Sequence, residues 1–167
     1  PANHNLEEQN EFQKNQIAEL IEEYPDAFYI WNDALDPHIM SAEEAKEFFN
    51  SAPRMVLTSS NWWDWGKKGT PFMDIPIKEM RHFPEDNDVY GETCWQLESK
   101  WFWNTGTSTQ KFTNILAQMD KALSRNSNFL LNVGPDKNGR IIDSSIKALN
   151  EIGKRLKQKC IKEIPAL

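Results

Sequence analysis

The sequence has only two cysteines, Cys94 and Cys160, among its 167 residues. Two cysteines are too few for a disulfide-bonded scaffold, and their spacing is not that of a zinc site. Long apolar runs are also missing, because no stretch approaches the roughly 20 apolar residues that span a bilayer. These absences argue against a small disulfide-rich module, a structural metal site and a membrane-spanning segment.

An excess of basic residues is missing as well. The 19 Lys and Arg residues face 25 Asp and Glu residues, which gives a formal charge of -6 and a pI near 5.1. This balance argues against a nucleic acid partner, since a phosphate backbone attracts basic surfaces. Tryptophan, by contrast, is abundant, with seven residues. Flat indole faces suit the apolar faces of sugar rings as well as ordinary protein cores.

Hydrophobic periodicity predicts alternating strands and helices. Apolar segments at 28–31, 54–58, 89–93 and 128–133 are typical of buried strands. Residues 59–88 are predicted to form one long loop. Helices are expected at about 6–24, 41–50 and 108–123, and Asp143 or Ser144 is expected to cap a last one. Its apolar face is expected to contain Ile146, Leu149, Ile152 and Leu156. The alternation predicts an α/β fold with a parallel sheet.

Polar residues lie where three of these strands are expected to end. Asp33 follows the segment 28–31, Glu92 follows Val89 and Tyr90, and residues 127–136 read SNFLLNVGPD. In a parallel barrel such strand ends lie on one face, the catalytic one. A complete (β/α)₈ barrel needs roughly 250 residues. We therefore expect this chain to be part of a larger TIM-like barrel.

Each of these acidic residues also has an ordinary interpretation. Asp33 could be a turn aspartate that caps local backbone amides, because Asp favours turns. Glu92 could be an acid with a raised pKa among aromatic residues, or an exposed side chain. The three histidines, His4, His38 and His82, have polar, turn-like neighbours and are interpreted as surface or loop residues.

Taken together, the motifs resemble a known family. The sequences Trp31-Asn32-Asp33, Gly91-Glu92-Thr93-Cys94 and Trp101-Phe102-Trp103, followed by residues 128–136 and Gly139-Arg140-Ile141, are similar to the carboxyl-terminal half of family 29 glycoside hydrolases, the α-L-fucosidases. The resemblance extends from about residue 16 to residue 156, and it is loose in the tryptophan-rich loop near position 62. It implies that residues 1–167 form about the second half of a (β/α)₈ TIM-like barrel, as the carboxyl-terminal part of a single glycoside hydrolase catalytic domain.

This resemblance implies exo-hydrolysis of α-L-fucosides with retention, through a covalent glycosyl-enzyme and without a metal or other cofactor. It implies that Asp33 is the nucleophile and that Glu92 is the acid/base, which protonates the leaving oxygen and then activates water. Retention requires the two carboxyl groups to lie about 5 Å apart. The fucose ring is expected to contact tryptophans, namely Trp31, Trp63, Trp101 and Trp103.

Several positions depart from the family pattern. Asn32 and Ala34 replace an aromatic residue and a glycine beside the expected nucleophile, Asn104 replaces a His or Tyr, and the family's fucose-binding histidines lie on earlier strands. The expected partners are a fucosylated oligosaccharide or glycoconjugate and the missing first half of the barrel. The family resemblance implies an extracellular, periplasmic or lysosomal location. A non-catalytic carbohydrate-binding protein on the same scaffold, or a structural half whose tryptophans are core, are the alternatives.

Overall fold

The computed structural model describes residues 5–27, 29–31, 47, 56–57 and 75–163. Backbone contacts divide the chain into two compact units, Pro1–Ile77 and Lys78–Leu167, and each is described here by itself. Nearly all of the helix expected at 41–50, the turn expected at 32–34 and the tryptophan-rich loop lie outside the described residues. Whether the two units belong to one domain stays a prediction.

The first unit begins with helix α1 (Leu6–Glu23), close to its predicted bounds. The Asn5 side chain caps it by accepting a hydrogen bond of 3.2 Å from the backbone N–H of Glu7, which lies in an acidic first turn suited to the helix dipole. Ile17 is buried, whereas Phe12 and Tyr24 are largely exposed. Capping and charge therefore agree with the boundaries that the sequence predicts.

Two short strands follow α1, β1 (Tyr29–Ile30) and β2 (Val56–Leu57). They pair in parallel, with Tyr29 opposite Val56 and Ile30 opposite Leu57. Both strands were predicted from apolar runs, and their parallel pairing agrees with the predicted sheet type.

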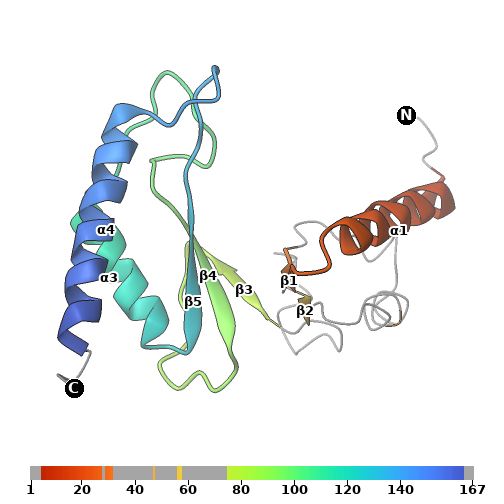
Figure 1. Cartoon of the computed structure of the whole chain (residues 1–167), viewed down its shortest axis with the longest axis horizontal. Helices are drawn as coiled ribbons and strands as arrows, with labels where there is room; N and C mark the ends of the chain where they lie inside the picture. The colour runs from red at the N-terminus through yellow and green to blue at the C-terminus, as the bar shows by residue number, and fades with distance from the viewer. Residues whose placement is uncertain (1–4, 28, 32–46, 48–55, 58–74, 164–167) are drawn as a thin grey trace. The chain divides into compact units, whose positions relative to one another are not determined.

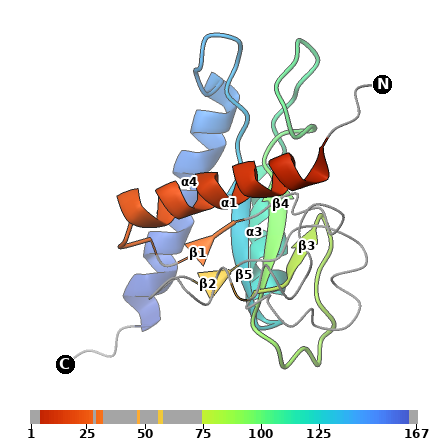
Figure 2. The same cartoon turned by 90° about the vertical axis from the view of Figure 1, so that its right-hand side faces the viewer.

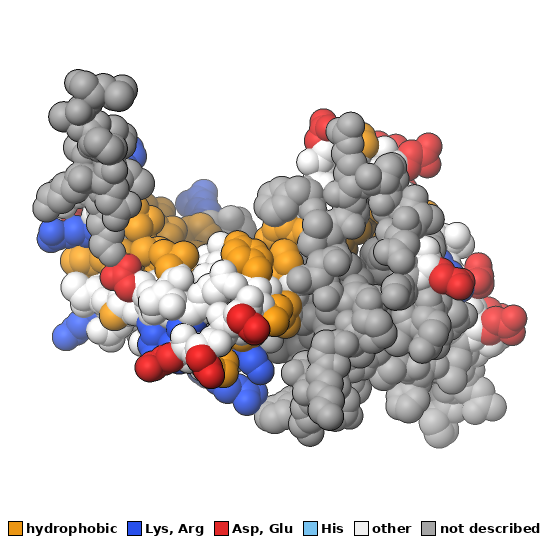
Figure 3. Space-filling view, turned by 90° about the horizontal axis from the view of Figure 1, so that it is seen from below, with side chains coloured by type: hydrophobic (Ala, Val, Ile, Leu, Met, Phe, Trp, Pro, Cys, Tyr) orange, Lys and Arg blue, Asp and Glu red, His pale blue; other side chains and the backbone are white. Residues whose placement is uncertain are grey.

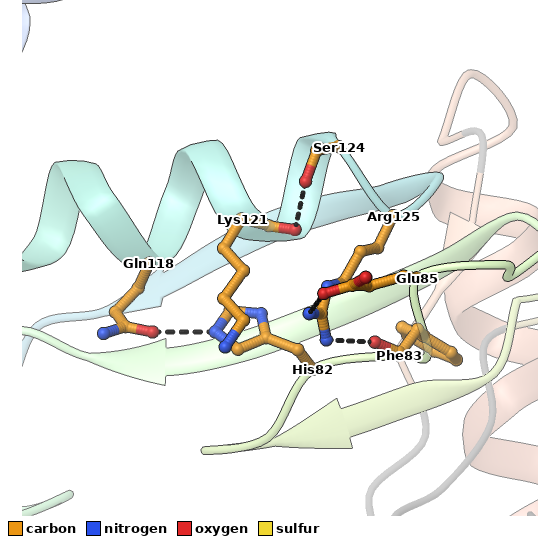
Figure 4. A network of polar contacts seen from close by, with 7 residues as sticks. All are labelled: His82, Phe83, Glu85, Gln118, Lys121, Ser124 and Arg125. Atoms are coloured by element: carbon orange, nitrogen blue, oxygen red, sulfur yellow. Dashed lines mark hydrogen bonds and ion pairs between the residues drawn. The ribbon is translucent and has the colours of Figure 1, made fainter.

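The second unit is built on a three-stranded sheet in the order β3 (Ile77–Glu79), β4 (Gly91–Gln96) and β5 (Ser127–Asn132). Strands β4 and β5 run parallel, with Gly91 opposite Ser127 and Gln96 opposite Asn132. The arrows of β3 and β4 also point the same way in the close view of Figure 4. The sheet is therefore parallel, as predicted.

Helices α3 (Phe112–Leu123) and α4 (Asp143–Glu163) lie side by side along this sheet (Figures 1 and 2). The buried core between them consists of Leu97, Ile115, Ala148 and Ile152. Other apolar side chains pack against it, namely Trp95, Phe112, Leu116, Phe129, Leu131, Val133, Leu149 and Leu156. Because side chains alternate along a strand, Glu92, Cys94 and Gln96 of β4 face away from the helices.

The predicted apolar face of α4 needs one correction. Ile146 is 43% exposed, whereas Ser145, Ala148 and Ile152 are buried. Residues three and four positions apart share one side of a helix, so the buried stripe follows 145, 148 and 152 and leaves position 146 at its edge. A small polar residue thus occupies a core position that the hydrophobic pattern assigned to isoleucine.

The connection before β4 also differs from the prediction. The segment 59–88 contains strand β3, and β4 begins at Gly91 and continues to Gln96 instead of covering 89–93. Phe83 is buried where a Cβ atom added to Gly91 would lie 2.4 Å from its ring, while Val89 and Tyr90 are about half exposed. Phe83 therefore covers the start of β4. The sequence pattern had instead placed Val89 and Tyr90 in the buried strand.

Polar contacts fasten this connection to the end of α3 (Figure 4). Arg125 donates to the carbonyl oxygen of Phe83 at 2.6 Å and forms an ion pair of 3.0 Å with Glu85. Nε2 of His82 lies 2.7 Å from Oε1 of Gln118, and its ring stacks on Trp95 with the centroids 5.3 Å apart. His82 is thus a loop histidine, as interpreted, but a partly buried one with a packing role.

Candidate functional site

A pocket lies beyond the carboxyl ends of β4 and β5. Its volume is about 500 Å³, and its walls come from the loop after β4 and the turn after β5. The lining residues are Trp101, Phe102, Trp103 and positions 132–137. Ligand sites of parallel α/β folds lie at this end of the strands, so the pocket is the candidate site of the second unit.

The loop after β4 is held by hydrogen bonds at its base and at its tip. Leu97 accepts from Gln110 at 2.9 Å and Ser99 donates to Ser108 at 2.8 Å, both through the backbone. At the tip, the Asn104 N–H donates to the Thr107 hydroxyl at 2.8 Å. The aromatic side chains of this loop therefore project from a defined backbone.

The turn after β5 packs directly against that loop. The Asn132 side-chain amide donates to the carbonyl oxygen of Trp101 at 3.0 Å. A Cβ atom added to Gly134 would lie 3.2 Å from the backbone nitrogen of Trp103. Only a residue without a side chain allows this close approach at no cost. The position of Gly134 in the motif thus has a packing reason.

A buried carboxylate supports the same wall of the pocket. Glu98 is 1% exposed and accepts hydrogen bonds from the Gly134 N–H at 3.2 Å and from the Ser145 hydroxyl at 2.5 Å. The Ser145 hydroxyl in turn lies 2.9 Å from that of Thr109. Buried carboxylates are costly unless they are hydrogen-bonded. These donors offset that cost and join the loop, the turn and the start of α4.

Asp136 belongs to the turn that closes the motif. Its carboxylate accepts backbone hydrogen bonds from Asn138 at 2.8 Å and Arg140 at 3.0 Å. These bonds to Arg140 and Asn138 hold the pKa of Asp136 below its usual value. Gly139 has a positive φ of 77°, as predicted for this turn. Asp136 therefore stabilises the backbone that borders the pocket.

The predicted site residues fall into three groups. Asp33 and Trp63 lie outside the described residues. Trp31 is partly buried directly after β1, in the first unit. Trp101 and Trp103 are also partly buried, and both line the pocket. Their contact with the fucose ring stays a prediction.

Glu92 occupies a different place from the one expected. It is the second residue of β4, so it lies at the amino end of the strand, not at its carboxyl end. It is 2% exposed and accepts a hydrogen bond of 2.8 Å from the Asn128 side chain. At about 3.3 Å per residue, four residues separate it from the carboxyl end by roughly 13 Å. The expectations that Glu92 ends a strand, and that it could be an exposed side chain, are both wrong.

Comparison with known proteins identifies the family. A sequence model of the α-L-fucosidases matches residues 2–160. The chain belongs to the α-L-fucosidase family. Its relatives include Alpha-L-fucosidase 1 of Arabidopsis thaliana, which is 24% identical over 179 residues, covering 86% of this chain and 34% of the plant protein.

Solved α-L-fucosidase structures share the fold. Isoenzyme 1 from Paenibacillus thiaminolyticus superimposes with a TM-score of 0.76 at 19% identity, over 94% of this chain and 40% of that protein. The Thermotoga maritima α-fucosidase gives a TM-score of 0.72 at 23% identity, over 90% of this chain and 33% of that one. The chain thus spans between a third and two fifths of these fucosidases.

Two residues of the site were not singled out from the sequence. Glu98 follows β4 and supports the wall of the pocket, and Phe102 lines the pocket with 84% of its surface exposed. Phe102 carries a visible signal, because it lies between two tryptophans that were chosen.

Two further properties concern only the described part of the chain. No group of three or more His, Cys, Asp or Glu side chains gathers there in a way that could hold a metal ion. Within the same residues, none of the helices has the length and apolar character needed to cross a membrane. On the face shown in Figure 3, hydrophobic side chains lie among polar and charged ones.

Proposed function

We propose that the complete protein hydrolyses α-L-fucosides with retention, and that this chain supplies the carboxyl-terminal part of a (β/α)₈ barrel. The proposed fucoside hydrolysis is supported by membership of the α-L-fucosidase family. The barrel is supported by the parallel strands, by helices on one face of the sheet, and by structural neighbours that extend well beyond this chain. In such a barrel the sheet face opposite the helices lines the interior.

Asp33 is the proposed nucleophile. It follows β1 and Trp31, which is where a barrel strand delivers a catalytic carboxylate. Its carboxylate would attack the anomeric carbon while the glycosidic bond breaks, forming a covalent fucosyl-enzyme that water then hydrolyses. This assignment rests on the sequence motif and on the position of Asp33 in the sequence after β1.

The acid/base has two candidates, Glu92 from the sequence motif and Glu79 from the structure. Active sites of (β/α)₈ barrels lie at the carboxyl ends of their strands. Glu92 lies at the opposite end of β4, and its carboxylate already accepts from Asn128. These two observations indicate that Glu92 is a structural carboxylate near the amino ends of the barrel strands, and they do not suit a proton donor.

Glu79 meets the positional requirement. It is the last residue of β3, and the Met80 N–H donates to the Cys94 carbonyl at 2.9 Å. In a parallel pair this bond places Glu79 beside Cys94, on the face that points away from the helices. Lys78 takes the opposite face, where its ammonium lies 5.8 Å from the centre of the Phe83 ring. We therefore favour Glu79 as the group that protonates the leaving oxygen and then accepts a proton from water.

Azide rescue distinguishes the two carboxylates. In the full-length gene product, the acid/base variant should retain activity on a dinitrophenyl fucoside, which needs no proton, and should lose it on an alkyl fucoside. Azide should then give the α-fucosyl azide, because it attacks the covalent intermediate in place of water. We expect this pattern for Glu79→Gln. Asp33→Ala should instead yield the β-fucosyl azide.

Glu92→Gln is the matched control. Its relative activity on the dinitrophenyl and alkyl fucosides should equal that of the parent protein, and only its free energy of unfolding should fall. If Glu92→Gln instead loses activity on the alkyl fucoside alone and gives the α-fucosyl azide, while Glu79→Gln behaves like the parent, then Glu92 is the acid/base. Activity that survives Asp33→Ala without azide would remove the nucleophile assignment.

A carbohydrate-binding protein without catalysis is the second candidate, because an aromatic pocket binds sugars whether or not it cleaves them. The same samples separate the two functions. Binding of fucosylated oligosaccharides by the parent protein, without turnover of the dinitrophenyl fucoside, would favour this candidate.

A further inference from the structure

Phe102 is the most exposed of the large hydrophobic side chains that the structure describes, at 84%. The tryptophans on either side of it, Trp101 and Trp103, are both partly buried. An isolated exposed aromatic residue on a protein surface needs no explanation. Phe102 differs because it borders a pocket of about 500 Å³ that both tryptophans also line.

The backbone of Phe102 is fixed on both sides. The preceding carbonyl, that of Trp101, accepts from the Asn132 side chain, and the following residue, Trp103, packs against Gly134. Gly134 is held in turn by the buried carboxylate of Glu98. A fixed aromatic platform loses little conformational entropy when a ligand stacks on it. The loop therefore presents Phe102 in a form suited to binding.

The lining of the pocket suits a carbohydrate. Its walls are aromatic and apolar, with contributions from Val133 and Pro135, and its rim carries the exposed donor Lys137. Sugars combine apolar ring faces with hydroxyl groups, so they match a stacking surface bordered by a few polar groups. The volume lies within the range of about 300–1,000 Å³ that holds ligands of several rings.

We propose that Phe102, at the exposed edge of this pocket, stacks on the sugar to which the fucose is attached. This inference rests on the proposed fucoside hydrolysis. Trp101 and Trp103 remain the expected fucose wall, and Phe102 stacks on the leaving group. Phe102 then discriminates between substrates by the nature of that group and not by the fucose.

The experiment compares two substrates of the full-length protein. Fucosyl fluoride has a leaving group without a ring, whereas a fucosylated lactose presents a sugar beside the fucose. Phe102→Ala should lower kcat/KM for the lactose derivative by roughly 3- to 10-fold, the range that an aromatic contact supplies. It should leave fucosyl fluoride within about 2-fold. Phe102→Trp should preserve both activities.

Tyr90→Ala is the control for the loss of an exposed aromatic side chain. Tyr90 is 54% exposed and directly precedes β4, at the strand end opposite to the pocket. It should leave both substrates unchanged. Equal losses on both substrates in Phe102→Ala, or no loss on either, would overturn the assignment while leaving fucoside hydrolysis intact. A parent protein that cleaves neither substrate would overturn the proposed function and this inference together.

Discussion

The carboxylate of Glu98 accepts a hydrogen bond of 3.2 Å from the backbone N–H of Gly134, and both residues are buried. Glu98 follows β4, whereas Gly134 lies in the turn after β5. The second carboxylate oxygen accepts from the Ser145 hydroxyl in the first turn of α4. One side chain therefore joins the three segments whose positions set the shape of the pocket.

Removal of this carboxylate should destabilise the protein strongly. Glu98→Ala leaves the Gly134 N–H and the Ser145 hydroxyl without their acceptor, and each buried unsatisfied group costs about 1–3 kcal/mol. We expect a loss of roughly 2–4 kcal/mol in the free energy of unfolding, measured by urea denaturation. Glu98→Gln keeps an oxygen acceptor and should lose about half as much or less.

Glu151→Ala provides the control for Glu98. Glu151 forms an ion pair of 2.6 Å with Lys154 on the exposed surface of α4. Such pairs contribute about 0–1 kcal/mol, so its removal should barely change the unfolding midpoint. A Glu98→Ala protein as stable as Glu151→Ala would show that the buried contacts add nothing to stability.

Gly134→Ala should disturb the pocket through a single added methyl group. The new Cβ would lie 3.2 Å from the Trp103 nitrogen and 3.7 Å from the Phe102 carbonyl carbon, both backbone atoms. Overpacking against backbone costs about 1–3 kcal/mol. We expect a lower thermal midpoint by calorimetry and a higher KM for fucosides, since the aromatic loop must shift.

Gly153→Ala tests the same substitution where space is available. Gly153 lies within α4, and no atom outside the neighbouring backbone of the helix comes within 4 Å of its added Cβ. Alanine favours a helix over glycine by about 1 kcal/mol, so this variant should be more stable than the parent. Equal effects at the two glycines would contradict the argument from close approach.

The sequence predicted the elements whose residues carry a regular apolar period. Strand β5 and helix α3 followed from their apolar residues, of which Phe129 and Leu131 in β5 and Ile115 and Leu116 in α3 pack in the core. The family motif selected Trp101 and Trp103, and both line the pocket. Periodicity and motif thus gave the core and one wall of the site.

What failed depended on contacts between distant residues. Glu92 was expected at a strand end, because Val89 and Tyr90 look like strand residues. Phe83 covers Gly91 instead, so β4 starts later and Glu92 falls near its beginning. Glu98 gave no signal either, since its partners lie 36 and 47 residues further along the chain. The hydrophobic period of a short segment does not predict contacts between residues so far apart in the sequence.

Arg125 makes two contacts of unequal value. Its bond to the carbonyl oxygen of Phe83 is part-buried, whereas its ion-pair partner Glu85 is 88% exposed (Figure 4). Exposed ion pairs contribute about 0–1 kcal/mol, but a buried carbonyl that loses its donor costs about 1–3 kcal/mol. Arg125→Met should therefore destabilise the protein by roughly 1–3 kcal/mol, and Glu85→Gln by less than about 0.5 kcal/mol.

Urea unfolding of both variants at two salt concentrations separates the contributions. Salt should remove most of the small Glu85 effect, because exposed charges are screened. It should leave most of the Arg125 effect, since that effect reflects an unpaired carbonyl. Equal losses in the two variants, or a loss at Arg125 that vanishes in high salt, would assign the stabilisation to the ion pair.

The turn at Asp136 should loosen in acid. Backbone hydrogen bonds from Arg140 and Asn138 hold its pKa below the usual value of 3.8. A carboxylate whose pKa is lowered by folding stabilises the folded form above its unfolded pKa, and this contribution disappears as the pH falls through the lower, folded pKa. The amide signals of Asn138 and Arg140 should therefore titrate with a midpoint below 3.8 in NMR spectra. Asp136→Asn keeps an oxygen acceptor without a titrating group, so both amides should lose this transition. A midpoint at or above 3.8 in the parent, or an unchanged transition in Asp136→Asn, would show that the Asp136 carboxylate does not hold the turn.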